Sequence, residues 1–250
     1  MEDEMIRGET SPSPGASQSV QELNTILPRQ SVVEVEIPIK GLLVRESVVV
    51  CDSTENQVEA QCSNISHFCT GTYEYPIYVK PDGMTRALTC RLSDIVAYSG
   101  KLLMKDFRLM GDVWIERECE RVQPKEPVFM TVQIGVQKIR ANLFDLSLSG
   151  MCVLIDKKLL PGRRSLINRK LKISMKLPCS RAACQIKGSV VQVRPISDHL
   201  VRVGMNITMD AKDAGVIAHY LTERKREILD ELFLNFMQLL HHRETKDQYF

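Results

Sequence analysis

Hydrophobic and polar residues alternate along most of the chain between Ser31 and Ile207, with the period of two that is typical of β-strands. The turn signal Pro81-Asp82-Gly83 separates two such runs and predicts a hairpin. The strand-like runs of this half cover residues 32–37, 42–44, 47–50, 77–79, 84–92, 96–98 and 101–104. They predict a small, barrel-like all-β domain over residues 31–115.

A second group of strand-like runs follows, and residues 171–177 alternate most strictly. The runs cover residues 128–134, 137–144, 151–155, 171–177, 185–193 and 200–207. Because no helical pattern lies between these short runs, they predict an antiparallel sheet or a closed barrel.

The period changes after Asp210, which is suited to cap a helix and is followed by Asp213 three residues later. Apolar residues then recur at helical spacing from 217 to 240, which predicts an amphipathic helix over about residues 210–242. Two roles stay open for its apolar stripe: packing on the chain's own barrel, or a homodimer contact between two helices.

The first 30 residues are rich in Ser, Pro, Gly, Gln and Glu, a composition that predicts a disordered arm. The chain begins Met1-Glu2-Asp3-Glu4, without the basic and apolar regions of a secretory signal, and no apolar run is long enough to cross a membrane. Eight cysteines in a chain of 250 residues without such a signal favour reduced thiols in the cytoplasm. The net charge of +2 gives no indication of nucleic-acid binding.

Two short motifs carry the chemistry. Arg117 and Arg121 stand four residues apart before the second strand group, and Asp145, Ser147 and Gly150 follow at the end of a strand. An arginine fork fits a phosphate or the O6 and N7 atoms of guanine, while a carboxylate accepts hydrogen bonds from guanine N–H groups. A serine hydroxyl reaches a phosphate oxygen, and glycine permits close approach of the backbone.

The two motifs resemble the RxxxR and D/N-x-S-x-x-G signatures of the PilZ domain family. The order of the later strands, with Leu160-Pro161-Gly162 and a closing helix, is similar to a whole PilZ domain, so residues 116–250 are expected to form it. The resemblance implies a six-stranded antiparallel barrel with a C-terminal helix, cyclic di-GMP as ligand, and no cofactor. It also implies that Arg117, Arg121, Asp145, Ser147 and Gly150 bind the ligand, in an effector and not an enzyme.

The expected layout, a β domain joined through RxxxR to a PilZ domain, resembles the flagellar brake proteins. That resemblance implies a receptor in which the ligand reorients the two domains and thereby regulates a protein partner, the flagellar motor. Glu116, Glu118 and Glu120 surround the arginines and would repel phosphate. The alternative is therefore an interaction scaffold that keeps the fold and binds no nucleotide.

Two other groups of residues invite functional interpretations. Cys62, His67 and Cys69, like Cys179 and Cys184, have spacings that fit a tetrahedral metal site poorly, so packing is the favoured role and no metal is expected. A basic stretch lies within residues 157–176 and could attract nucleic acid or an acidic partner. Because it lacks interleaved aromatic residues, a solvated barrel face without nucleic acid is favoured.

Overall fold

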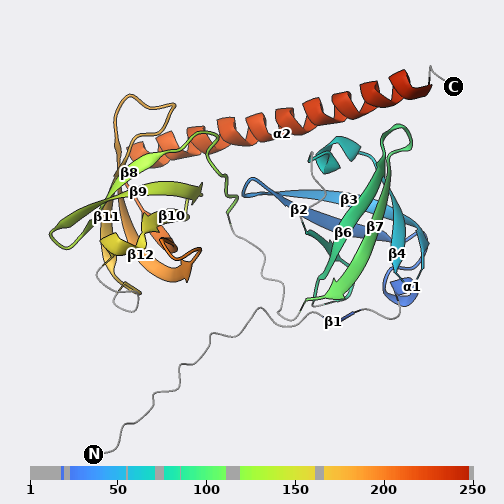
Figure 1. Cartoon of the computed structure of the whole chain (residues 1–250), viewed down its shortest axis with the longest axis horizontal. Coiled ribbons are helices and arrows are strands. Elements are labelled where there is room, and N and C mark those ends of the chain that lie inside the picture. Colours follow the sequence, from blue (N-terminus) through green and yellow to red (C-terminus); the bar gives the residue numbers. More distant parts are fainter. Residues whose placement is uncertain are drawn as a thin grey trace, which may run out of the picture. The chain divides into compact units, whose positions relative to one another are not determined.

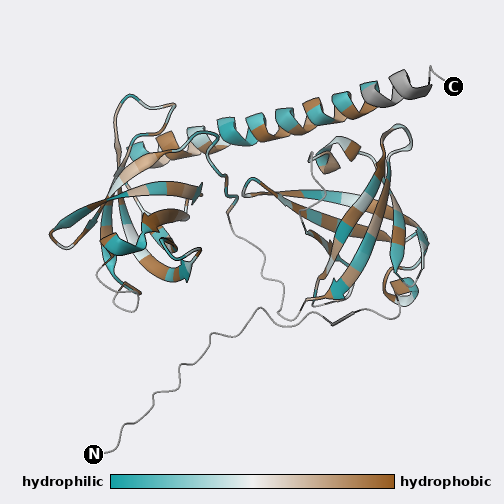
Figure 2. Ribbon diagram, viewed as in Figure 1, coloured by the Kyte–Doolittle hydropathy of each residue, from teal (hydrophilic) through white to brown (hydrophobic). Residues whose placement is uncertain are grey.

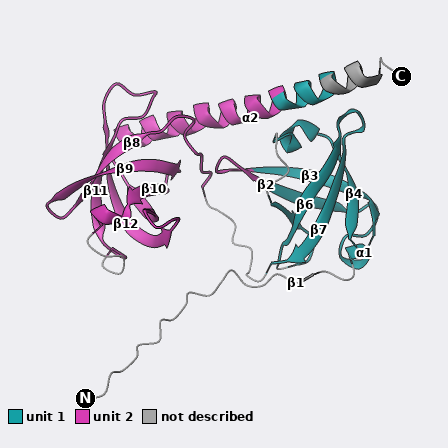
Figure 3. Ribbon diagram, viewed as in Figure 1, with its two compact units in different colours: residues 1–37, 44–116, 235–250 teal, residues 38–43, 117–234 magenta. Residues whose placement is uncertain are grey.

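The computed structural model describes residues 18–19, 23–54, 56–70, 76–84, 86–110, 119–160 and 166–247. The chain is mainly β, with two antiparallel barrels and a long C-terminal helix, which confirms the predicted fold class (Figure 1). It divides into two compact units (Figure 3). Unit 1 comprises residues 1–37, 44–116 and 235–250, and unit 2 comprises residues 38–43 and 117–234.

Unit 1 contains a sheet in the order β1-β7-β4-β3-β2-β5-β6, and the added pairing of β7 with β6 closes it. Its strands are β1 (Gln18–Ser19), β2 (Val32–Ile39), β3 (Leu42–Ser53), β4 (Gln57–Cys62), β5 (Ile77–Lys80), β6 (Leu88–Val96) and β7 (Lys101–Leu109). Short helical segments are α1 (Leu23–Ile26) and the 3-10 turns η1 (Ile65–Phe68) and η2 (Ala97–Ser99). The predicted hairpin exists, since β5 and β6 pair on either side of the Pro81-Asp82-Gly83 turn.

Two strand predictions in unit 1 need correction. The runs at 42–44 and 47–50 form one strand, β3, and Arg45 between them pairs with the buried Glu36 at 2.8 Å across the sheet. The strand predicted at 96–98 is wrong: Ala97–Ser99 is a 3-10 turn that ends at Gly100 in the left-handed conformation.

The segment just before β2 is folded. Leu23 and Leu27 are among the fully buried side chains, and Leu27 N donates to Leu23 O to close the single turn of α1. Most of the arm predicted for residues 1–30 lies outside the described residues. Its last part, by contrast, packs into unit 1, because these two leucines have apolar surface to bury.

Unit 2 contains a closed six-stranded barrel in the order β10-β13-β12-β11-β8-β9, with all pairs antiparallel. Its elements are β8 (Phe129–Ile134), β9 (Gln137–Leu146), β10 (Gly150–Asp156), the 3-10 turn η3 (Lys157–Leu159), β11 (Lys170–Met175), β12 (Cys184–Pro195) and β13 (Leu200–Thr208). Side chains that point inward are buried, such as Leu171, Ile173 and Met175 of β11. The lysines that alternate with them, Lys170 and Lys172, point outward and are exposed. Figure 2 shows this alternation of hydropathy along the strands.

Helix α2 (Ala211–Asp247) follows the unit 2 barrel, and its last residues are grouped with unit 1. Asp210 caps it as expected, because its Oδ1 accepts a hydrogen bond from Asp213 N at 2.8 Å. Asp213 in turn accepts from Gln185 N of β12 at 2.8 Å, which ties the start of the helix to the barrel. No helix in the described part of the chain is long and apolar enough to span a membrane.

Candidate functional site

The turn between β9 and β10 is closed by the serine of the second motif. Ser147 Oγ donates to Gly150 O and accepts from Gly150 N, both at 2.9 Å, while Ser147 N donates to Gly150 O at 2.8 Å. The serine is buried, and Ile207 N donates to Ser149 O at 2.9 Å. The hydroxyl of Ser147 therefore closes this turn, and the hydrogen bond from Ile207 of β13 holds the turn against the neighbouring strand.

Arg121 is held beside this turn by the backbone. Val122 and Leu146 exchange two hydrogen bonds of 3.0 Å, which places the residue before Val122 next to the end of β9. The guanidinium Nη2 of Arg121 lies 3.9 Å from the position that a Cβ atom on Gly150 would occupy. The structure thus brings Arg121 together with Ser147 and Gly150. Arg117, with Glu116 and Glu118, lies outside the described residues.

Asp145 lies at a β-bulge, opposite Cys152 on β10. The pKa of the Cys152 thiol is raised to about 11, mainly by burial and then by the negative charge of Asp145, while the positive charges of Arg202 and Arg121 act in the opposite direction. All three charges therefore lie close enough to Cys152 to act on it. Asp145 and Arg121, predicted from separate motifs, belong to one cluster.

Arg202 is a member of this cluster that the motifs did not indicate. It projects from β13 with its guanidinium 4.4 Å from the centre of the Phe144 ring, a cation–π contact. The available signal was its outward position between the buried Val201 and Val203 in an alternating strand. That signal shows which face a side chain occupies, but not which residues from other strands share it.

A cavity of about 460 Å³ adjoins the turn, next to the loop that carries Arg121. Its lining consists of Cys119, Glu120, Leu148, Ala218, Leu221, Thr222 and Lys225. Glu120 pairs with Lys225 of α2 at 2.5 Å, so its charge is directed to the helix. One of the three glutamates expected to repel phosphate is therefore partly neutralised by an exposed partner.

The cluster has the chemistry for an anionic nucleotide. Arg121 supplies a permanent positive charge and a planar set of donors, suited to phosphate or to a guanine edge. Asp145 supplies a carboxylate that can accept from guanine N–H groups. A larger residue would be crowded at position 150, since a Cβ atom there would lie 3.3 Å from Met205 O.

The cysteine groups considered for metal binding have other surroundings. Burial raises the pKa of Cys62 and of Cys69 to about 11, which keeps both thiols protonated near neutral pH. His67 pairs with Glu46. Among the residues that the structure describes, no three His, Cys, Asp or Glu side chains are grouped so that they could hold a metal ion.

Comparison with known proteins gives one family. Residues 115–223 match the PilZ domain. Among proteins with curated descriptions, none is a significant match to the chain.

Solved structures with a similar fold include the inhibitor of motility MotI/DgrA from Bacillus subtilis (13% identity, TM-score 0.40, covering 80% of this chain and 98% of that one). They also include YcgR from Escherichia coli in complex with c-di-GMP, with 10% identity and a TM-score of 0.41, covering 80% of this chain and 86% of that one. A third is the MrkH–c-di-GMP complex from K. pneumonia, with 14% identity and a TM-score of 0.42, covering 82% of this chain and 92% of that one.

Proposed function

Because residues 115–223 belong to the PilZ domain family, we propose that this chain is a receptor for cyclic di-GMP and acts as an effector, not as an enzyme. The observation that carries the proposal is the position of Arg121, whose guanidinium lies beside Gly150 and acts on the same thiol as Asp145. These residues come from two separate motifs, and the Val122–Leu146 bridge brings them together.

In this proposal Arg121, with Arg117 from the same loop, grips phosphate and guanine, and Asp145 accepts from guanine N–H groups. Ser147 holds the turn so that Gly150 lets the ligand approach the backbone. Arg202 adds positive charge next to Asp145. The ligand orders the loop of Arg117 and Arg121, and this ordering changes the orientation of the two units; it shifts that equilibrium only by its difference in affinity for the two states.

The test is calorimetric titration of the whole chain with cyclic di-GMP. A charge-assisted hydrogen bond contributes about 1.5–3 kcal/mol, so Arg121→Ala should weaken binding by about 10- to 150-fold. Asp145→Ala should weaken it similarly. Arg140→Ala is the matched control, because Arg140 lies on the same strand β9 as Asp145 but stacks on Phe129 at 4.2 Å. Equal affinity of the Arg121 and Arg140 variants would refute the assignment.

A scaffold that keeps the fold and binds no nucleotide is the second candidate. One observation favours it: the Ser147 hydroxyl is already used within the turn, where it donates to Gly150 O. Absence of heat in wild type, together with capture of a partner whether or not the messenger is present, would select this alternative.

The output assigned to the receptor is regulation of a protein partner in the cytoplasm, with the flagellar motor as the partner that the domain layout suggests. Homodimerisation through α2 is the accompanying proposal. Phe233, Leu234 and Met237 of this helix are about half exposed, at 54%, 60% and 46%. Light scattering over a range of concentrations should then give a dimer mass that Phe233→Ser reduces to that of a monomer.

A further inference from the structure

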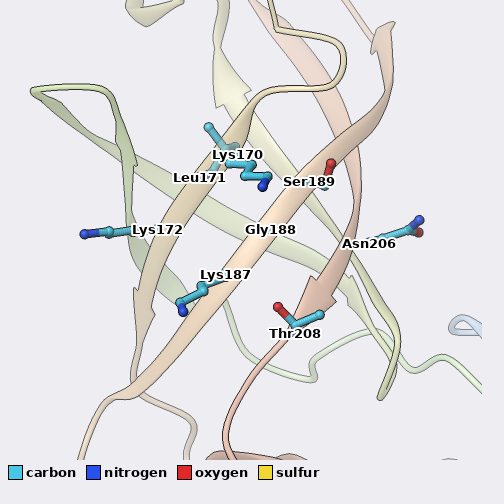
Figure 4. Close-up of a pocket in the computed structure, with 8 residues that line it drawn as sticks. All are labelled: Lys170, Leu171, Lys172, Lys187, Gly188, Ser189, Asn206 and Thr208. Carbon is cyan, nitrogen blue, oxygen red and sulfur yellow. The ribbon is translucent and has the colours of Figure 1, made fainter.

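A basic groove lies on the outer face of β11, β12 and β13. Its volume is about 440 Å³, and its lining consists of Lys170, Leu171, Lys172, Lys187, Gly188, Ser189, Asn206 and Thr208 (Figure 4). Leu171 and Gly188 are buried, so they form the floor. The three lysines and the polar side chains are outward positions of the three strands.

The register of the strands, not the sequence alone, brings these lysines together. Lys172 lies directly opposite Lys187, and Lys170 lies opposite Ser189. On the other side of β12, Lys187 pairs with Thr208 and Ser189 pairs with Asn206. Of the basic stretch recognised in the sequence, only Lys170 and Lys172 line the groove, and Lys187 joins them from a different strand.

Among the described residues, the positive charge of the groove has no acidic partner. None of its lining residues is acidic, and in the described ranges no carboxylate lies within ion-pair distance of any of the three lysines. Asp210 and Asp213 follow Thr208 in sequence, but they are engaged in capping α2 and in binding Gln185 N. Like charges placed directly opposite on neighbouring strands destabilise a sheet, and an acidic occupant would relieve that repulsion.

We propose that this groove docks an extended acidic segment of a partner protein, with carboxylates at alternate positions. Alternate residues of an extended chain are about 6.7 Å apart, which equals the spacing of Lys170 and Lys172 along β11. Lysines act as point charges that suit single carboxylates, and Ser189, Asn206 and Thr208 can hydrogen-bond to the segment's backbone. The closed barrel offers no free strand edge here, so side chains have to provide the contacts.

A nucleic acid fits the groove less well. Sequence-tolerant binding of single strands uses aromatic platforms, and a duplex footprint uses about six to ten phosphate contacts. The groove offers three cations and no aromatic side chain.

The groove lies next to the proposed messenger site, because Asn206 at one end of the groove pairs with Gly150. Only the role of the acidic segment as the partner of a messenger receptor rests on the proposed function.

The test uses the whole chain without messenger and a fluorescent peptide of alternating Glu and Ser, compared with its Gln-Ser counterpart. We expect wild type to bind the acidic peptide only, and the affinity to fall as added salt shortens the screening length from about 10 Å at 0.1 M to about 3 Å at 1 M. The variant Lys170→Gln/Lys172→Gln/Lys187→Gln should weaken binding about tenfold or more. Neutral replacements create no new ion pairs, and circular dichroism checks the barrel.

The matched control is Lys105→Gln/Lys138→Gln/Lys158→Gln, which removes the same charge from exposed lysines outside the groove. An equal loss in this control would show a diffuse charge effect and overturn the proposal. Stronger binding of duplex DNA or phosphatidylglycerol vesicles through the groove lysines would also overturn it. So would a loss of cyclic di-GMP affinity in the groove variant as large as that of Arg121→Ala, since the lysines would then belong to the messenger site.

Discussion

Arg224 of α2 is one of the buried charged residues that the structure describes in unit 2. Only 3% of it is exposed. Its Nε donates to Gln123 O at 3.0 Å, and its Nη1 lies 2.8 Å from Glu227 Oε2 and 3.4 Å from Glu231 Oε1. Gln123 stands two residues after Arg121, so this arginine fixes the segment that leads into the candidate site.

The same segment is bound from a second direction within unit 2. Gln123 N donates to Lys40 O at 2.7 Å, and Lys40 pairs with Glu231. Gly41 next to Lys40 has a φ of +85°, and a Cβ atom there would lie 3.1 Å from Gln123 N. The β2–β3 turn, residues 122–123 and α2 therefore form one connected network that centres on Arg224.

Replacing Arg224 by Met keeps the apolar stem and removes every donor. The Gln123 carbonyl then stays covered without its charged partner, which costs about 1–3 kcal/mol. Glu227 and Glu231 are 48% and 28% exposed and can be solvated, so each lost ion pair adds only about 0–1 kcal/mol. The expected total is about 1–5 kcal/mol. For a chain of this size, this should lower the Tm of unit 2 by on the order of 2–20 °C.

The assay is thermal melting followed by circular dichroism, with hydrogen exchange at Val122 and Leu146 as a local readout. Arg226→Met is the matched control: it lies on the same helix, is 67% exposed, and pairs only with Glu223 at 2.6 Å among the described residues. That control should shift stability by less than about 1 kcal/mol. If the two variants melt alike and exchange alike at Val122, the network does not hold the segment.

Two further predictions concern the turn and the network. Ser147→Ala removes a buried hydroxyl that both donates to and accepts from Gly150, so it should cost about 1–3 kcal/mol in a thermal melt, whereas the exposed Ser149→Ala should stay within about 0.5 kcal/mol. For Glu231, partial burial acts to raise the pKa, but the hydrogen bond and charge of Lys40, with Arg224, outweigh it and lower the pKa below 4.5. Its contribution to stability is therefore present above about pH 4.5 and is lost as the pH falls through the lowered value; Glu231→Gln should flatten this acid limb, and an unchanged limb would contradict the reasoning.

Strict alternation allowed the strongest strands to be predicted because each inward position carries a large apolar side chain. The run at 171–177 became β11, and Leu171, Ile173 and Met175 are buried. Strand β4 was missed because its inward residues Val58, Ala60 and Cys62 are small and follow a turn-like Asn56. The strand predicted at 96–98 is wrong because Ala97–Ser99 forms a 3-10 turn. Gly100 ends this turn in the left-handed conformation, which glycine adopts readily.

The motif residues show a different limit. Spacing alone brought Asp145, Ser147 and Gly150 to one strand end, since all three lie within six residues. That Arg121 lies beside them depends on the Val122–Leu146 bridge, a pairing between segments with no periodic pattern of their own. Arg202 reaches the cluster through barrel register, and Arg224 reaches Gln123 through helix packing; both effects bring together residues that are far apart in sequence.

Arg224 and Arg121 have the same side chain but different roles, and their different exposure explains why. Arg224 is buried, and its Nε and Nη1 atoms donate to acceptors of unit 2, so its charge is used within the fold. Arg121 is half-buried at the edge of a turn whose own hydrogen bonds are completed by Ser147 and Gly150. A guanidinium that the turn does not need for its own closure remains available for an anion, and this difference makes Arg121 the residue on which messenger binding should depend.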